Sequence, residues 1–525
     1  MKYLKNIKNV ALSLVLPMAL VSCTEVWNDH YDVDSQKQSA DKTLWEEIES
    51  HPELQGFAEC LKQYGYDKVL DGDQIYTVFA PQGSLDVAKL SSEKVKVEVL
   101  ENHIARFAHS ANKATVGKSV MMLNEKLLDF TVAGEGYTLG NIALAETNIV
   151  AKNGVLHIVK SQVPFFYNVW EYLTTDSAYS TICDYLYSFD EYELDEESSV
   201  KGPIVDGLQT YVDSVLVSYN KMRMLLGDLN DEDSTYTMIL PTNKAWEAAY
   251  QRIAPYYVYS AKTVDRDSLQ DYYTKKSIVS DLIFSHTVQK SMTDSLISTS
   301  LNVFHNPFDY ILSDYNSMED GIVCSNGNVF VVDELRHAPW DSWHAPLQVE
   351  AERITGHKVS ETTGIEYSRT MKNADPLYNK VSKSAYLEVV SKKLYQANAP
   401  SVDFYIWNTL AATYDIKVVF LPQSLATDKS YGINPVHLAA EISYLNEKGK
   451  IIQKPLKLVE AKDSVFVDPT RIDTVTLGTV TFPVTTYGEE TASTILTVKS
   501  ASNSKDKVNS RVLLIDCVIL EPTKE

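Results

Sequence analysis

Few residues of this 525-residue chain have the types and spacing that enzyme chemistry needs. A hydrolase nucleophile commonly stands in Gly-x-Ser-x-Gly, where a strained turn exposes the serine, and the chain contains no such sequence. None of the eleven histidines forms the His-Glu-x-x-His pattern that places two imidazoles on one helical face for zinc. No Cys-x-x-Cys pair is present, which argues against a zinc ribbon or a thioredoxin-like site. These motifs predict a protein that is not an enzyme and that uses no metal and no cofactor.

One acidic run has part of the ligand pattern of a calcium loop. Asp228, Asn230 and Glu232 alternate as such ligands do, but Asp233 stands where the sharp turn of the loop needs glycine. We therefore expect a solvated acidic loop here.

Two aromatic residues have a spacing that suits sugar binding. In an expected strand over residues 402–408, Tyr405 and Trp407 project to the face opposite Phe404 and Ile406. Aromatic rings pack well against the apolar faces of sugars, so Tyr405 and Trp407 form a candidate glycan platform. A central strand that is buried on both faces explains the same pattern equally well.

The N-terminus carries the residues of a targeting signal. Lys2, Lys5 and Lys8 precede an apolar stretch over residues 10–21, which is too short to span a bilayer. The sequence Leu20-Val21-Ser22-Cys23 resembles a bacterial lipobox, which predicts a signal peptide at residues 1–22 and acyl chains, such as palmitate, on Cys23. Several acyl chains give stable anchoring to a membrane without spanning it. Residues 23–40 read as a flexible, acidic tether.

The acidic residues after Cys23 resemble the export signal of Bacteroidetes surface lipoproteins. This resemblance predicts an outer-membrane lipoprotein that faces the cell exterior; an anchor that faces the periplasm is the alternative. The formal net charge of −22 excludes nucleic acid as a partner, because binding to phosphates requires clustered Lys and Arg.

One pattern of elements occurs twice along the chain. A short apolar strand runs into a proline, a His follows, and an Asn-Gly pair opens a second apolar strand. The first copy has Tyr76–Pro81, His103, Asn153-Gly154 and His157; the second has Tyr236–Pro241 with Thr242-Asn243, His286, Asn326-Gly327 and Phe330. We expect each Asn-Gly to form a tight turn, and we expect His103 and His286 to be equivalent. A helix over residues 43–64 should precede the first copy, with Asp41 or Thr43 as its cap.

These residues resemble the fasciclin (FAS1) family, over about residues 41–165 and 166–338. The first copy departs from the family at Gln82 and Gly83, and the second has Phe330 where the family has His. The resemblance implies two tandem α+β domains with a role in adhesion or binding. It also implies that the motif residues are structural: Pro81, His103, Asn153, Gly154, His157, Pro241, Thr242, Asn243, His286, Asn326 and Gly327.

The second copy is longer than the first because it carries two insertions. The first insertion includes the acidic run over residues 190–197, and the second is rich in tyrosine, with Tyr256, Tyr257, Tyr259 and Tyr273 among its residues. Long insertions commonly carry function, so either one could line an interface; a decorated surface is the alternative. Trp340 and Trp343, which follow the second copy, are expected to pack between domains.

Residues 345–525 contain at least seven short alternating segments with turn signals between them. This pattern predicts an all-β antiparallel sandwich, and its first and last segments resemble a galactose-binding-like jelly roll. Cys517 lies in an apolar run and is expected to be buried, while a Cys183–Cys324 disulfide stays open.

These expectations describe a non-catalytic surface lipoprotein for adhesion or for binding a ligand or partner. We expect an accessory component of an outer-membrane nutrient-uptake system, in contact with a transporter or with other surface lipoproteins. The alternative is a glycan-binding protein whose sandwich reads polysaccharide.

Overall fold

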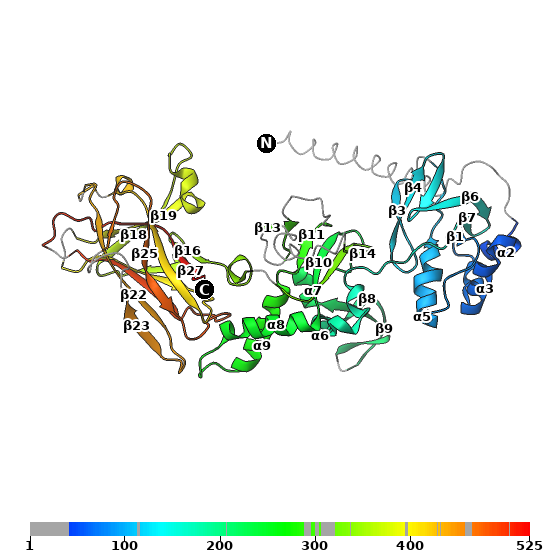
Figure 1. The fold of residues 1–525 in the computed structure, drawn as a ribbon, viewed down its shortest axis with the longest axis horizontal. Helices are drawn as coiled ribbons and strands as arrows, with labels where there is room; N and C mark the ends of the chain where they lie inside the picture. Colours follow the sequence, from blue (N-terminus) through cyan, green and yellow to red (C-terminus); the bar gives the residue numbers. More distant parts are fainter. Residues whose placement is uncertain are drawn as a thin grey trace, which may run out of the picture. The chain divides into compact units, whose positions relative to one another are not determined.

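The computed structural model describes residues 41–112, 116–205, 207–287, 296–299, 304–305, 321–335, 338–393, 397–427, 429–430, 432–456, 465–502 and 505–524 (Figure 1). The predicted signal peptide, Cys23 and the tether lie outside these ranges. No helix within them is long and apolar enough to cross a membrane. The chain divides into two compact units, one of residues 1–172, 228–235 and 322–328 and the other of residues 173–227, 236–321 and 329–525.

The first unit contains a seven-stranded sheet of order β2-β1-β7-β6-β5-β4-β3. Its central strand β1 (Tyr76–Pro81) is buried along its whole length and pairs in parallel with β7 (Gly154–Val159). The other strands are antiparallel to their neighbours: β2 (Ile104–Arg106), β3 (Lys118–Met121), β4 (Leu127–Ala133), β5 (Gly136–Leu139) and β6 (Ile142–Ala151).

Short helices precede and follow β1: α2 (Leu44–Ser50), α3 (Gln55–Tyr64), α4 (Tyr66–Leu70) and α5 (Ser92–Lys94). The apolar positions of the predicted helix over residues 43–64 are fully buried and join the core beside β1 and β7: Leu44, Ile48, Leu54, Phe57 and Leu61. The periodicity therefore identified the buried face. Thr43 caps α2: its hydroxyl accepts from the Glu46 amide, and the Glu46 carboxylate accepts from the Thr43 amide. The cap is therefore a capping box.

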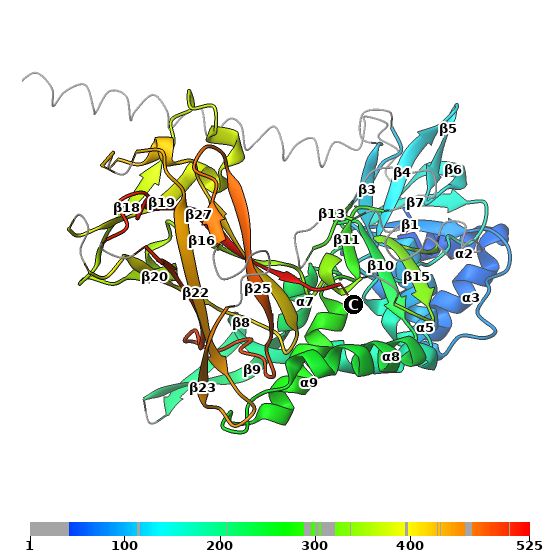
Figure 2. The ribbon, with the colours of Figure 1, turned by 60° about the vertical axis from the view of Figure 1, so that its left-hand side comes forward.

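The second copy of the pattern forms a four-stranded sheet of order β11-β10-β15-β14. Its strands are β10 (Tyr236–Pro241), β11 (Ile283–Ser285), β14 (Ile322–Cys324) and β15 (Gly327–Val332), and β12 (Leu296–Ile297) pairs separately with β13 (Phe304–His305). The helices of this segment are α6 (Ser180–Tyr187), α7 (Lys221–Leu226), α8 (Asn243–Ile253) and α9 (Arg266–Val279). The first insertion is a long hairpin of β8 (Asp190–Val205) and β9 (Leu208–Asn220), and Figure 2 draws it as a separate two-stranded ribbon.

Residues 347–522 form the predicted β-sandwich, in which every recorded strand pair is antiparallel. One sheet has the order β18-β19-β27-β21-β25, with β16 also paired to β27: β16 (Leu347–Glu350), β18 (Gly364–Thr370), β19 (Ala385–Ser391), β21 (Thr413–Phe420), β25 (Asp473–Thr481) and β27 (Leu513–Pro522). The other has the order β17-β20-β26-β22-β23, with β24 paired to β22: β17 (His357–Val359), β20 (Ser401–Ile406), β22 (Val436–Leu445), β23 (Ile451–Pro455), β24 (Val465–Val467) and β26 (Thr494–Ser500).

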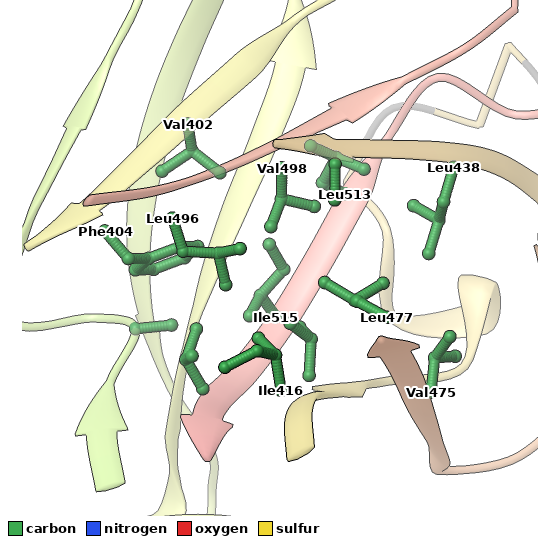
Figure 3. Close-up of a cluster of buried hydrophobic side chains, with 14 of the residues drawn as sticks. Val402, Phe404, Ile416, Leu438, Val475, Leu477, Leu496, Val498, Leu513 and Ile515 are labelled. Carbon is green, nitrogen blue, oxygen red and sulfur yellow. The ribbon is translucent and has the colours of Figure 1, made fainter. Parts of the chain in front are cut away.

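A single apolar core lies between these two sheets. Figure 3 shows side chains of both sheets that point into this core: Val402, Phe404, Ile416, Leu438, Val475, Leu477, Leu496, Val498, Leu513 and Ile515. Strands β20, β22 and β26 bury alternate residues, as the period-2 pattern predicted. Strands β19 and β27 of the other sheet bury consecutive residues, of which Tyr386, Val390 and Leu514 belong to a second apolar cluster. Cys517 is buried in β27, as expected.

The tyrosine-rich second insertion packs against the sandwich within the second unit. Tyr257 and Tyr259 are buried, and the Tyr259 hydroxyl donates to the Tyr487 carbonyl oxygen at 2.9 Å. The rings of Tyr257, Tyr273 and Tyr487 lie 5.0–5.9 Å apart by their centroids. The insertion thus lines an intramolecular junction, one of the two alternatives that the sequence left open.

Backbone hydrogen bonds complete this junction. The amides of Thr485, Ala411 and Ala261 donate to the carbonyl oxygens of Val258, Tyr256 and Glu447. Trp343 is 9% exposed and packs edge-on against Tyr256, at 4.8 Å between ring centroids. Trp343 thus packs on the second copy, and the adjacent His344 packs on Tyr414 of the sandwich. Trp340 is partly exposed, and the Lys524 ammonium lies over its ring.

Candidate functional site

The best candidate site is the outer face of the sheet β17-β20-β26-β22-β23, which we define by Asp403, Tyr405, Trp407, Glu441, Thr497 and Lys499. Burial alternates along β20, so Val402, Phe404 and Ile406 enter the core while Asp403 and Tyr405 face outward and stay partly exposed. The same alternation runs along β26 and β22. The alternative of a strand buried on both faces therefore does not describe β20.

The strand register places the outer-face residues in cross-strand rows. Asp403 lies opposite Thr497, and Thr497 lies opposite Glu441. The Thr497 hydroxyl donates to Asp403 Oδ1 at 2.6 Å, and Lys499 Nζ lies 3.9 Å from a Glu441 oxygen. Neighbouring strands therefore present acceptors, a hydroxyl and an ammonium on one rigid surface.

Tyr405 and Trp407 form the aromatic part of the outer face. Their ring centroids are 6.2 Å apart and their planes are inclined by 60°. The chain turns immediately after Trp407, at Asn408, which has φ +60° and whose Oδ1 accepts from the Gly488 amide. Two partly exposed rings beside hydrogen-bonding side chains are suited to an uncharged ligand with apolar faces and hydroxyl edges, such as a sugar.

The two Asn residues of the Asn-Gly pairs have the same role in the two copies. Asn153 accepts from the Leu44 amide at 2.8 Å and donates to the carbonyl oxygens of Leu70 and Gly72. Asn326 accepts from the Val169 amide at 2.9 Å and donates to the carbonyl oxygens of Leu229 and Asp231. Each buried amide thus joins a strand to two other segments of backbone.

The expected turn geometry at Asn153-Gly154 was wrong in detail. Ala151 pairs with Gly154, so Lys152 and Asn153 are the two turn residues, and neither has a positive φ. Gly154 belongs to β7 with φ +152°, and a Cβ there would overlap the Tyr76 carbonyl oxygen. Glycine is required for the close approach of β1, and asparagine for its side-chain bonds.

His103 and His157 are fully buried in the first unit. Nδ1 of His103 lies 2.6 Å from the Val99 carbonyl oxygen and its Nε2 accepts from the Val163 amide. His157 stacks on Phe79 and its Nε2 lies 2.8 Å from the His109 carbonyl oxygen. Burial lowers the pKa of each imidazole to about 4, so both side chains are neutral at pH 7.

The expected equivalence of His103 and His286 is wrong. Tyr76 lies opposite Arg106, whereas Tyr236 lies opposite Ser285, so His286 corresponds to Phe107. Both residues have a positive φ, +68° for Phe107 and +67° for His286, and the carbonyl oxygen of each accepts from the Thr hydroxyl of the adjacent strand. The His286 side chain is exposed, so its backbone, not its imidazole, has the structural contact.

The proline motifs end their strands and start the next element. Pro81 ends β1 and Pro241 ends β10. Thr242 caps α8 by accepting from the Ala245 amide. Asn243 accepts from the Thr181 amide and donates to the Ser177 carbonyl oxygen and the Ser180 hydroxyl.

A buried ion cluster in the first unit was not foreseen. Lys126 Nζ lies 2.5 Å from Glu171 and 2.7 Å from Glu232, and its side chain is 4% exposed. The Asn168 amide group and the Ser325 hydroxyl also donate to Glu232. The acidic run was expected to be a solvated loop, and Asp228 and Asn230 are indeed exposed. The Glu232 side chain is only 9% exposed, because it pairs with the buried Lys126 ammonium. Lys126 itself lies in a turn with no sequence motif, so its role could not be read from the chain.

The described residues contain no group of three or more His, Cys, Asp or Glu side chains placed to hold a metal ion. Cys60, Cys183, Cys324 and Cys517 are free thiols. The Cys183–Cys324 disulfide that the sequence left open is therefore absent from the structure.

Comparison with known proteins gives one family match. Residues 52–163 match the model of the fasciclin domain. No curated protein matches the chain. Among solved structures, a FAS1 domain pair of the insect cell adhesion molecule Fasciclin I is 16% identical, over 55% of this chain and 98% of its own, with a TM-score of 0.22. The C-terminal family 22 carbohydrate-binding module of Clostridium thermocellum Xyn10B is 10% identical, over 33% of this chain and 91% of its own, with a TM-score of 0.21. The chain thus contains a fasciclin domain at residues 52–163, within an α+β fold that ends in a β-sandwich.

Proposed function

We propose that this protein is a non-catalytic binding protein of the cell surface, in which the outer face of the sandwich binds polysaccharide. In this proposal acylated Cys23 anchors the chain in the outer membrane, on the side that faces the cell exterior. The protein then serves as an accessory component of a nutrient-uptake system that holds a glycan near a transporter.

The observation that carries the proposal is the partly exposed pair Tyr405 and Trp407, with ring centroids 6.2 Å apart. Tyr405 lies on β20, whose other face is buried in the core, and Trp407 follows one residue after the end of the strand. The strand holds Tyr405 in place before a ligand arrives, and the Tyr405 ring packs edge-on against Trp407, so binding needs to order little. Asp403 on the same strand, Thr497 on β26 and Glu441 on β22 supply hydrogen-bonding groups for sugar hydroxyls. The fasciclin domain supports a role in adhesion or binding.

Affinity electrophoresis tests the proposed function, with the full chain run in native gels that contain soluble polysaccharides of plant, fungal or bacterial origin. We expect at least one polysaccharide to retard the protein. Trp407→Ala and Tyr405→Ala should each weaken its binding about tenfold or more, as loss of a buried aromatic contact does. Tyr367→Ala is the matched control, because Tyr367 is 40% exposed on β18 of the other sheet.

The proposal fails if no polysaccharide retards the protein, or if Tyr367→Ala weakens binding as much as Trp407→Ala. Release of reducing sugar from the bound polysaccharide would contradict the non-catalytic role. Purification from detergent-solubilised membranes should recover a transporter or another surface lipoprotein with the chain, and recovery of the chain alone would contradict the uptake role.

A further inference from the structure

The β8–β9 hairpin exposes more apolar side-chain surface than a free two-stranded ribbon should. Within the described residues, β8 and β9 form a sheet by themselves. Ten of their large apolar side chains are at least 36% exposed: Tyr192, Leu194, Val200, Ile204, Val205, Leu208, Val212, Val215, Leu216 and Val217. Isolated hairpins are only marginally stable in water, and apolar patches of this kind mark interaction sites.

The two strands of the hairpin differ in charge and in proline content. β8 carries six acidic residues, and its pairing with β9 is interrupted by register shifts between Asp195 and Ile204. It also contains Pro203, which cannot donate to a new strand. Charges, irregularities and proline are the devices that protect an edge strand from pairing. β8 is therefore a protected edge.

β9 has no proline, and Asp213 is the single charged residue among its 13 residues, although its pairing with β8 shifts in register between Asp213 and Tyr211. Its register with β8 is regular from Asn220 to Val215, and Val212, Leu216 and Val217 are 50–76% exposed. An edge with little charge and no proline presents backbone groups and apolar side chains together, as strand addition requires.

The sequence of β9 fits a second copy of itself. If two β9 strands pair antiparallel about Ser214, apolar residues meet across the pair and Asp213 never faces its copy: Tyr211 lies opposite Val217, Val212 opposite Leu216, and Asp213 opposite Val215. Aromatic and β-branched residues are favourable cross-strand partners. In the resulting order β8-β9-β9-β8, the two acidic strands are about 14 Å apart, beyond the Debye length of about 8 Å at physiological salt.

We propose that β9 is a self-association edge, and that two copies of this chain pair through Tyr211–Val217 of β9 into a four-stranded sheet. A single strand pair lies at the low end of interface sizes, so the dimer is reversible, with a Kd on the order of 1–100 µM. The acidic β8 edges on both sides stop the sheet from growing further.

A cysteine trap and sedimentation velocity test this proposal on the full chain. Residues opposite themselves in an antiparallel pair have Cα atoms about 4.5–5.5 Å apart, within the range that a disulfide spans. Mild oxidation of Ser214→Cys should therefore give a covalent dimer on non-reducing gels. Ser198→Cys, at an exposed position of β8, is the matched control and should stay monomeric.

Sedimentation velocity between about 1 and 200 µM should show a monomer–dimer equilibrium. The double variant Val212→Lys/Leu216→Lys should raise the Kd at least tenfold, because it places like charges across the pair. Val200→Lys changes an exposed apolar residue of β8 and should leave the Kd unchanged. A monomer at every concentration would overturn the proposal, as would equal cross-linking of Ser198→Cys and Ser214→Cys.

Discussion

Lys126 shows how one residue can hold several segments in place. Its ammonium neutralises Glu171 and Glu232, and Asn168 and Ser325 complete the hydrogen bonding of Glu232. Removal of one partner from a buried ion cluster leaves an uncompensated charge, which costs far more than the loss of an exposed pair.

Lys126→Met should therefore lower the free energy of unfolding of the first unit by about 3 kcal/mol, as measured by urea denaturation. The double variant Lys126→Met/Glu232→Gln should recover more than half of this loss, because it removes the stranded carboxylate. Lys96→Met breaks an exposed pair with Glu93 and should cost less than about 0.5 kcal/mol. Equal losses for Lys126→Met and Lys96→Met would show that the cluster is not stabilising.

Asp516 makes the stability of the sandwich depend on pH. Burial, with a further contribution from Glu350 and Glu352, raises the pKa of its carboxyl to about 7. A folded-state pKa above the unfolded value means that the protonated carboxyl favours the fold, so this stabilisation is complete below pH 4 and is lost as pH rises to about 7.

Asp516→Asn keeps the neutral form at every pH, and its side-chain oxygen can still accept from the Ser382 amide. The variant should match the native chain in melting temperature near pH 4 and exceed it at pH 8, by thermal unfolding at both values. A variant that is less stable at pH 8 would contradict the raised pKa.

At the scale of elements, alternation and periodicity predicted most of what is observed. The strand into Pro81 and the antiparallel sandwich are present as predicted. The periodicity over residues 43–64 identified the buried face, but the single helix expected there is interrupted at His51-Pro52 and forms α2 and α3. The register in which two strands pair cannot be predicted from such periodicity. The His103–His286 equivalence failed because it was based on sequence order, whereas strand pairing aligns His286 with Phe107.

The candidate site was only partly accessible to such reasoning. Alternation placed Tyr405 and Trp407 on one face, but their neighbours Thr497 and Glu441 come from strands that are distant in sequence. The insertion over residues 190–220 was recognised by its length and acidity, and its hairpin form was not.

Substitution of two glycines with positive φ distinguishes the cost of a steric clash from the cost of backbone strain. Gly154 (φ +152°) faces the Tyr76 carbonyl oxygen, whereas Gly134 (φ +63°) has open space where a Cβ would stand. Gly154→Ala should force β1 and β7 apart and lower the free energy of unfolding by more than about 3 kcal/mol. Gly134→Ala should lower the free energy of unfolding by about 1 kcal/mol, because an alanine in the left-handed region is strained but meets no clash. Urea denaturation distinguishes the two, and similar losses would show that β1 tolerates the added methyl group.

At the scale of the whole molecule, the functional prediction is based on the net charge and on the predicted targeting signal at the N-terminus. The residues before Cys23 predict where the protein acts and the net charge of −22 argues against nucleic acid as a partner, but neither identifies a ligand. The surfaces proposed to bind, the outer face and the β9 edge, are formed only by folding.

Cys23→Ala should abolish incorporation of labelled palmitate and move the chain from the membrane fraction to the soluble fraction, because acyl chains supply the anchor. In intact cells, added protease should digest the anchored native chain, as expected for display on the exterior. Cys183→Ala is the control and should keep both label and location. Labelling of Cys23→Ala, or protection of the native chain from protease, would contradict the proposed anchoring.

The junction between the tyrosine-rich insertion and the sandwich bears on how this protein evolved and how it can be engineered. Three backbone hydrogen bonds and the Tyr259–Tyr487 bond cross the junction, and Tyr257 is buried there. Recombination could therefore not move the sandwich alone to another gene without breaking these contacts. A transplanted sandwich would expose Tyr487 and its neighbours, so any exchange of the sandwich must carry the insertion with it.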